Sequence, residues 1–385
     1  MKPMPGVFIE DMGVKIGLNG VDNARLIFDN VKIKREQMLN KLNDVDEFGK
    51  FHSKQPKLGQ RFFKVADRLL SGRLCISSMN MAAAKKCLYE TIRYSQQRLA
   101  VGPDGHSNTP IMSYQLQQNA LLPLLARTVV LNFGLNAGKQ LFANQQERRH
   151  EVIKTLCVIK AMTSWHAEKT GRICRERCGG GSFLAYNMIG AGVMGAHSGV
   201  TAEGDNSVLM QKVTKDLLAH TNNKKHVMPK ILKSTIQKIA QKEDVSPFNC
   251  LKNLIYIREQ FELRNFTNKL KDLILDKQEK FYDVWMYKVN DDIQSCAQAF
   301  GERFFLQNAY LAMENECTNK VVKDILQKTI YLHMITYVNE NMGWYLRHKF
   351  VNPIAASDLM KKQDIAVKDL VPHINTILEG FGLLK

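Results

Sequence analysis

Two glycine-bearing segments about twenty residues apart offer the clearest chemistry in this chain. Residues 172–181, RICRERCGGG, end a helical pattern in three consecutive glycines, and residues 201–206, TAEGDN, open the next helical pattern. Backbone without Cβ atoms can approach a phosphate or a ribose closely. Asp205 and Asn206 are also residue types that commonly cap helix N-termini, and the spacing by itself favours this structural role.

A match to the dinucleotide-binding fingerprint lies between these segments. Gly190, Gly192 and Gly195 fit G-x-G-x-x-G letter for letter. That fingerprint works only after a strand and at the start of a helix, with an acidic residue about 20 positions later. Here the preceding pattern is helical and no alternation of strands and helices surrounds it. We therefore interpret the glycines as helix packing through small residues, or as a loop.

The eight cysteines do not predict a metal site. The closest pair, Cys174 and Cys178, would share one face of a helix, but no His or Cys pair follows at zinc-binding spacing. The cysteine pattern favours reduced thiols in a reducing compartment.

Composition indicates a globular protein with a strong positive charge. The 385 residues include 54 Lys and Arg against 37 Asp and Glu, a formal net charge of +17, and 45% are hydrophobic, which excludes a disordered or collagen-like chain. Nucleic acid, a phosphorylated small ligand and a solvated lysine-rich face would each explain this charge. Because no nucleic-acid-binding pattern accompanies the charge, we expect no nucleic-acid partner.

The positions of the prolines indicate where long helices can form. Residues 57–102 and 124–228 contain no proline, and proline breaks helix interiors. Apolar residues recur at helical spacing, which predicts helices over 60–100, 111–144, 147–178 and 206–220, and a second strongly helical region over 249–345. Aromatic residues recur near helical spacing within that region and are expected to belong to its core: Tyr282, Trp285, Tyr287, Phe300, Phe304 and Phe305. We expect no membrane-spanning segment and no secretory signal.

The N-terminal region has a different pattern. Residues 7–9, 14–16 and 26–28 are short aliphatic or aromatic runs separated by turn residues, which predicts two or three strands. So few strands do not make a stable sheet alone, so the segment has the pattern of the end of a β-domain. The predicted organisation is a β remnant at 1–50, a first helical bundle at 51–225 and a second at 226–385. The fold class is mainly α.

Several of these motifs, taken in order, resemble the acyl-CoA oxidases, within the acyl-CoA dehydrogenase superfamily. The segments that carry the resemblance are IRYSQQRLAVGP, SYQLQQNALLPLLA, CRERCGG and TAEGDN, and the opening MGVKIGLNGVDNARLIFDNVKI resembles the end of the family's middle β-domain. The resemblance runs from about residue 5 to the C-terminus and is strongest up to about residue 215.

The resemblance implies FAD-dependent desaturation of a fatty acyl-CoA to the trans-2-enoyl-CoA, with O2 reduced to H2O2, in peroxisomal β-oxidation. Glu203 falls on the family's catalytic base, and a closed apolar site would raise its pKa toward working pH. Arg98 falls where the family places an arginine near the FAD pyrophosphate, and Gln115 falls on a partner-subunit flavin contact. The remaining positions implied for the cofactor are Cys178, Gly179, Gly180, Gly204 and Asp205. The family is a homodimer whose flavin sites are shared between subunits.

The chain also departs from the family. The resemblance implies that it lacks the N-terminal helical domain, most of the β-domain and the final segment with its peroxisomal tripeptide. Ser182 stands where the family usually has glycine, and its side chain would crowd a backbone approach. An inactive dimeric helical scaffold is therefore the alternative prediction.

Overall fold

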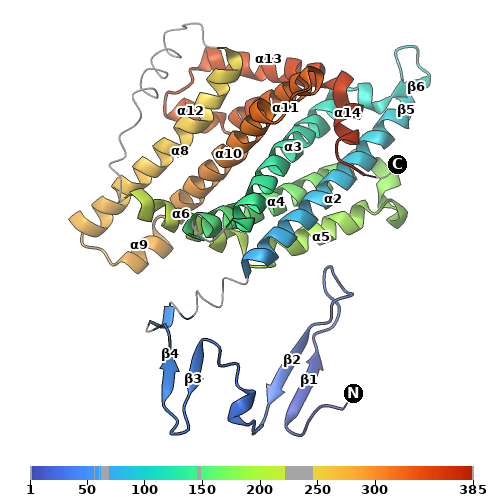
Figure 1. The fold of residues 1–385 in the computed structure, drawn as a ribbon. Coiled ribbons are helices and arrows are strands. Elements are labelled where there is room, and N and C mark those ends of the chain that lie inside the picture. The colour runs from blue at the N-terminus through green and yellow to red at the C-terminus, as the bar shows by residue number, and fades with distance from the viewer. Residues whose placement is uncertain are drawn as a thin grey trace. The chain divides into compact units, whose positions relative to one another are not determined.

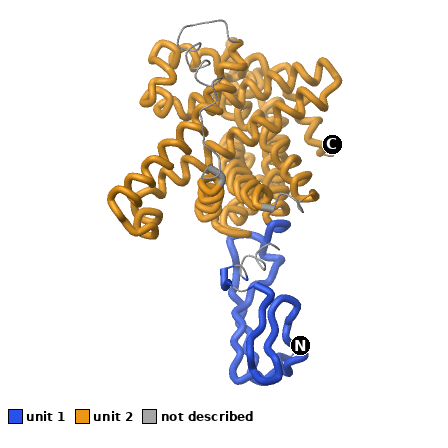
Figure 2. The backbone as a smooth tube through the Cα atoms, turned by 60° about the vertical axis from the view of Figure 1, so that its left-hand side comes forward, with its two compact units in different colours: residues 1–72 blue, residues 73–385 orange. Residues whose placement is uncertain are grey.

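The computed structural model describes residues 2–55, 57–59, 61, 69–144, 149–221 and 246–383. The chain separates into two compact units, residues 1–72 and 73–385 (Figure 2). The division falls at Gly72, within the first turn of helix α2. The larger unit consists mainly of helices (Figure 1). The predicted mainly α fold class is confirmed.

The N-terminal unit contains two short hairpins. Strands β1 (Val7–Asp11) and β2 (Ala24–Phe28) pair antiparallel, with Val7 opposite Phe28 and Ile9 opposite Leu26 on one face. Two of the three expected strands are thereby confirmed, whereas residues 14–16 lie in the connection between them. Nine of the ten paired positions are exposed, so this hairpin has no apolar core of its own.

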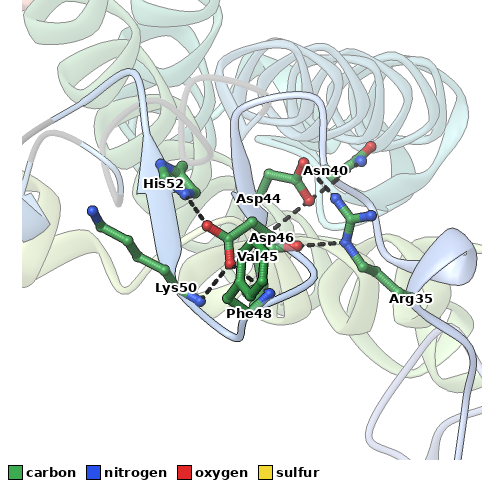
Figure 3. A network of polar contacts seen from close by, with 8 residues as sticks. All are labelled: Arg35, Asn40, Asp44, Val45, Asp46, Phe48, Lys50 and His52. Atoms are coloured by element: carbon green, nitrogen blue, oxygen red, sulfur yellow. Dashed lines mark hydrogen bonds and ion pairs between the residues drawn. The ribbon is translucent and has the colours of Figure 1, made fainter.

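The second hairpin is held by a polar network. Strands β3 (Asn43–Val45) and β4 (Phe51–Ser53) pair antiparallel. Asp46 accepts hydrogen bonds from the backbone amides of Phe48 and Lys50 and lies 2.7 Å from Nε2 of His52 (Figure 3). The hydrogen bond from His52 is the main cause that lowers the pKa of Asp46. Side-chain contacts with this aspartate thus fix the turn between two strands that are too short to do so alone.

The helical unit is built from long helices that pack along one another. α2 to α4 are 29 residues each, and α10 and α11 lie beside α3 and α8 (Figure 1). The helices are α2 (Leu69–Gln97), α3 (Gln115–Ala143), α4 (Arg149–Arg177), α5 (Ile189–Thr201), α6 (Asn206–Thr221), α8 (Pro247–Lys271), α9 (Phe281–Tyr287), α10 (Asn290–Asn315), α11 (Lys320–Glu340), α12 (Met342–Arg347), α13 (Pro353–Leu370) and α14 (Ile374–Glu379). A short hairpin of β5 (Leu99–Val101) and β6 (Ser107–Pro110) joins α2 to α3.

The long helices agree with the helical spacing of apolar residues in the sequence, and α3 continues through Pro123. The expected helices over 111–144, 147–178 and 206–220 correspond to α3, α4 and α6. The expected helix over 60–100 corresponds to α2 from Leu69, and most of its first part lies outside the described residues. The second predicted domain boundary, at 225, also lies outside them, so the three-part division stays a prediction. The helices on either side of it belong to one compact unit.

Helix α3 is the core helix of this unit. Among the described residues, it alone is long and apolar enough to cross a membrane, and 56% of that apolar window is buried inside the structure. It packs against α4, α10, α11 and α13. Its apolar composition therefore agrees with burial between other helices.

The dinucleotide-like glycines lie on helix α5, as the helix-packing interpretation expects. Gly192 faces α2, and a Cβ atom added there would lie 2.8 Å from the sulfur of Cys87. Such a distance is shorter than a side chain tolerates, so the glycine lets α5 approach α2 closely. No strand precedes the motif among residues 149–189.

One expectation about the core is wrong. The aromatic residues at helical spacing near residue 285 were expected to be buried, and Trp285 is buried, but Tyr282 and Tyr287 are 63% and 73% exposed. α9 has only seven residues and presents one face to the bundle, so its other aromatic side chains face solvent. Further along, Phe300 and Phe305 on α10 are buried as expected.

Candidate functional site

Glu203 lies in the four-residue connection between α5 and α6, residues 202–205, and has an unusual backbone conformation. Its φ is +58°, and that of the following Gly204 is +107°. A left-handed conformation is uncommon for a residue with a side chain, and surrounding structure must hold it in place. The side chain is half-buried, and its Oε2 atom is buried with no hydrogen-bond partner among the described residues. A buried carboxylate oxygen without a partner requires a functional or structural explanation.

Lys160, on α4, holds this turn in place. Its Nζ atom donates hydrogen bonds to the carbonyl oxygens of Val200 and Gly204, at 3.0 and 2.7 Å, and to Oδ1 of Asn206, at 2.9 Å. The side chain is fully buried, and this desolvation lowers the pKa of Lys160 to about 8 although the charge of Asp205 acts in the opposite direction. All three ammonium donors thus bind residues on both sides of Glu203.

Two further contacts complete the turn. Arg73, near the start of α2, donates from Nε to the carbonyl oxygen of Glu203 at 3.3 Å. Oδ1 of Asp205 accepts from the backbone amides of Ser207 and Val208, at 2.9 and 3.1 Å. Asp205 therefore caps α6, as its structural interpretation expects. Asn206 does not cap the helix, because it is buried and bonded to Lys160 and Ser164.

The glycine turn lies at the other end of α4. Gly179 has a φ of +60°, and a Cβ added at Gly179 or Gly180 would meet no atom within 4 Å. Both glycines are exposed, so their backbone is open to an approaching ligand. Cys178 is buried, and burial raises the pKa of its thiol. Its side chain therefore faces the protein interior, and only the backbone at this position can contact a ligand.

Ser182 supports this turn and does not crowd it. The residue is buried, and its Oγ donates to the carbonyl oxygen of Gly179 at 2.8 Å and accepts from Nη1 of Arg175 at 3.0 Å. It also contacts the carbonyl oxygen of Arg175. The expectation that a side chain here would obstruct the backbone is wrong, because the hydroxyl points inward beneath the turn.

Arg98 and Gln115 lie at the same end of the bundle as the glycine turn. Both are exposed, and no side-chain contact of Arg98 is present among the described residues. Gln117 connects this end: its Nε2 donates to Oγ of Ser95, at 2.8 Å, and to the carbonyl oxygen of Arg177, at 3.0 Å. These contacts join the end of α2, the start of α3 and the end of α4. Arg98, Gln115 and Gly179 therefore lie at the same end of the helical bundle.

The structure therefore separates the site residues into two groups. The first, which we name the Glu203 turn, comprises Glu203, Gly204 and Asp205, near the start of α2. The second, which we name the Arg98 end, comprises Arg98, Gln115 and the Cys178–Gly180 turn, near the end of α2. At 1.5 Å per residue, the 25 residues from Arg73 to Arg98 span about 38 Å. One chain does not bring the two groups together.

Two residues that hold these groups were not anticipated from the sequence. Lys160 lies at an inward position of a helical pattern, where its partners, 40 to 46 residues later, cannot be identified from spacing. Gln117 has no sequence feature that distinguishes it from other polar residues near the start of a helix. A lysine within an apolar run on α4 was the one signal available for Lys160.

A second buried group of charged residues lies between α3, α10 and α11. Arg127 donates both terminal nitrogens to the carboxylate of Glu302, at 3.0 and 3.1 Å, and Nε2 of His333 lies 2.7 Å from the same carboxylate. Burial alone would raise the pKa of Glu302, but the charges of Arg127 and His333 outweigh it and lower the pKa to about 2. Each charge is paired, which suits a role in joining the three helices.

Comparisons with known proteins agree with this fold. An acyl-CoA oxidase C-alpha1 domain model matches residues 67–218, and a second acyl-CoA oxidase family model matches residues 247–383. Peroxisomal acyl-coenzyme A oxidase 3 of Arabidopsis thaliana is 30% identical over 98% of this chain and 57% of its own length. An acyl-coenzyme A oxidase-like protein of Mus musculus is 29% identical over 93% of this chain and 59% of its own length.

Solved structures show the same architecture. The structure of Arabidopsis thaliana acyl-CoA oxidase 1 superposes with a TM-score of 0.83 at 21% identity, covering 99% of this chain and 60% of that chain. Acyl-CoA oxidase-1 of Caenorhabditis elegans, in complex with FAD and ATP, gives a TM-score of 0.85 at 18% identity, with coverage of 99% and 58%. This chain thus spans somewhat more than half the length of these relatives. With two matching family models, relatives along nearly its whole length and a shared fold, the chain belongs to the acyl-CoA oxidase family.

Proposed function

We propose that this chain takes part in FAD-dependent oxidation of a fatty acyl-CoA, with Glu203 as the base that removes the α-proton of the thioester. The single observation that carries the proposal is the buried Oε2 of Glu203, which has no hydrogen-bond partner among the described residues and belongs to a turn fixed by Lys160 and Arg73. A carboxylate on a fixed turn, with one oxygen free of hydrogen bonds, is suited to accept a proton from a substrate placed against it.

The residues at the Arg98 end fit a phosphate-bearing cofactor. The guanidinium of Arg98 is exposed and has no side-chain partner among the described residues, so both terminal nitrogens are available to a pyrophosphate. The backbone at Gly179 and Gly180 is open, and Gln115 is exposed at the same end of the bundle. Relatives of the same fold from Caenorhabditis elegans are complexes with FAD. FAD, when bound, supplies the acceptor for the β-hydrogen and passes the electrons to O2, which forms H2O2.

The other residues of the Glu203 turn prepare the base. Gly204 leaves its backbone free of side-chain atoms beside Glu203, and Asp205 fixes the start of α6. Lys160 stays close enough to Glu203 and Asp205 for their charges to raise its pKa against desolvation. The turn is therefore set before a substrate arrives, which lowers the cost of orienting the carboxylate during proton transfer.

The separation of the two groups supports a homodimer. About 38 Å along α2 is longer than an extended dinucleotide, so one flavin cannot reach both groups of the same chain. We infer that the Glu203 turn of one copy and the Arg98 end of another contact the same cofactor. The exposed Phe183, Leu184 and Tyr186, beside the glycine turn, provide apolar surface for such an interface. The peroxisomal relatives support the peroxisome as the compartment.

The test is to purify the 385-residue chain with FAD and supply fatty acyl-CoA under air. The proposal expects a yellow protein that releases H2O2 only when acyl-CoA is present, and loss of that release in Glu203→Gln. A dimer that takes up no FAD would favour the non-catalytic scaffold. Retention of full activity in Glu203→Gln would remove the assigned base.

A further inference from the structure

A cavity of about 190 Å³ lies between α2, α3, α11 and α14, separate from both groups described above. Its walls are mostly apolar, with Val129 and Phe133 from α3, Ile325 and Leu326 from α11, and Ile377 and Phe381 from the C-terminal segment. A cavity of about 150 Å³ with such walls is large enough to hold benzene. This one therefore has room for an apolar group of about six to eight carbon atoms.

One cation lines this cavity. Lys85, on α2, is half-buried, and its Nζ atom lies 5.7 Å from the ring centre of Phe381. Among the described residues, no carboxylate lies within ion-pairing distance of Lys85. Desolvation lowers the pKa of Lys85, and the like charge of Lys139 acts in the same direction. Lys212, which is also half-buried, is by contrast paired with Asp216.

Lys85 and the apolar walls together indicate which kind of ligand this cavity can bind. An ammonium without a counter-ion, placed beside a second cation at an apolar cavity, is stabilised by an anion that brings an apolar tail. Asn132 lines the same cavity and offers an amide donor to a second carboxylate oxygen. The small volume excludes a coenzyme A ester or a nucleotide from the cavity itself.

We propose that this cavity binds a small amphipathic monocarboxylate of about six to eight carbons in total, with its carboxylate on Lys85 and its tail between α3, α11 and α14. The tail contacts residues of α14 and the segment after it, so binding stabilises the packing of the C-terminus on α11. The proposal does not depend on the function assigned to Glu203.

The test is isothermal titration calorimetry of the full chain, without added FAD, with hexanoate and with hexanamide. Hexanamide has the same tail and shape but no charge. The proposal expects hexanoate to bind with one site per chain and hexanamide to bind at least about tenfold more weakly, because a hydrogen bond to a charged partner is lost.

Substitutions at the cavity test whether hexanoate binds there. Lys85→Met should weaken hexanoate binding by at least about tenfold. The adjacent Lys86→Met is the matched control and should leave hexanoate affinity unchanged, because Lys86 does not line the cavity. Val322→Trp fills the cavity from its partly exposed rim and should abolish binding without removing a buried contact. It keeps the test valid if Lys85→Met folds poorly.

Three results would overturn the proposal. The first is no hexanoate binding to the unmodified chain at millimolar concentration. The second is equal affinity for hexanamide. The third is unchanged binding in either Lys85→Met or Val322→Trp, with folding verified by circular dichroism.

Discussion

The Nζ atom of Lys160 lies 2.7 Å from the carbonyl oxygen of Gly204, the residue directly after Glu203. The same ammonium binds Val200 and Asn206, so one buried lysine fixes both ends of the turn that carries the proposed base. A buried cation has a desolvation cost, and here three acceptors offset part of it. The turn that presents Glu203 therefore depends on a residue of α4.

Removal of this lysine is expected to weaken the fold measurably. Lys160→Met leaves three acceptors without their donor and should lower the free energy of unfolding by about 2–3 kcal/mol. Urea denaturation followed by circular dichroism measures this. Lys169→Met, on the same helix, is the control: its exposed pair with Glu340 is worth about 0–1 kcal/mol. Equal effects of the two substitutions would show that Lys160 has no special structural role.

The lowered pKa of Lys160 gives a pH dependence with a defined sign. The pKa is about 8 in the folded chain against an ordinary value of 10.5, so between these pH values the unfolded chain binds more protons. Stability from this group is constant below about pH 8 and rises as pH increases from about 8 to 10.5. The free energy of unfolding of the unmodified chain minus that of Lys160→Met should therefore increase over this range. A flat difference would contradict the assigned burial.

The buried Glu302 gives a dependence of the same sign at acid pH, because its pKa is also lower in the folded chain than in the unfolded chain. Its pKa is about 2 in the folded chain against an ordinary 4.5, so its contribution is fully present above about pH 4.5 and is lost as pH falls through 2. Glu302→Gln should lower the free energy of unfolding at pH 7 by about 3–5 kcal/mol, because the partly buried Arg127 loses its charged partner. Thermal denaturation from pH 2 to 7 checks both statements, with Glu340→Gln as the exposed control. A change below about 1 kcal/mol for Glu302→Gln would argue against the ion pair.

The sequence predicted the helices well and the site contacts poorly. Proline-free stretches with helical spacing correspond to α2, α4 and α6, and helical spacing alone predicted α3, which contains Pro123. The spacing is informative because a long helix that buries one face repeats apolar residues every three to four positions. The three-residue strands β3 and β5 are too short to show a period, and they were not predicted. Such strands form because turn contacts, such as those of Asp46, hold them together.

The local sequence pattern also could not identify the residues that fix the Glu203 turn and the Arg98 end. The family resemblance located Glu203 and Arg98, but not Lys160 or Gln117, whose partners are distant in sequence. The family resemblance also could not show that the Glu203 turn and the Arg98 end lie at opposite ends of α2. That separation is a property of helix length and packing.

A mixed dimer tests whether two copies share a flavin site. Glu203→Gln and Arg98→Ala are each expected to be inactive as homodimers. When the two are unfolded together and refolded at equal concentration, half of the dimers pair one of each, and such a dimer has one intact site. Activity should return to about a quarter of the unmodified level, measured as H2O2 release. If each chain carries its own complete site, the mixture stays inactive.

The most direct measurement of the central assignment is flavin bleaching under anaerobic conditions. The FAD-loaded chain is mixed with fatty acyl-CoA in a stopped-flow instrument, and flavin absorbance is followed through one turnover. The account predicts rapid bleaching in the unmodified chain, and in Glu203→Gln retained FAD with bleaching slowed by at least about a hundredfold, the scale of general-base catalysis. Equal bleaching rates in the two proteins, or no bleaching in either, would contradict the claim that Glu203 removes the α-proton.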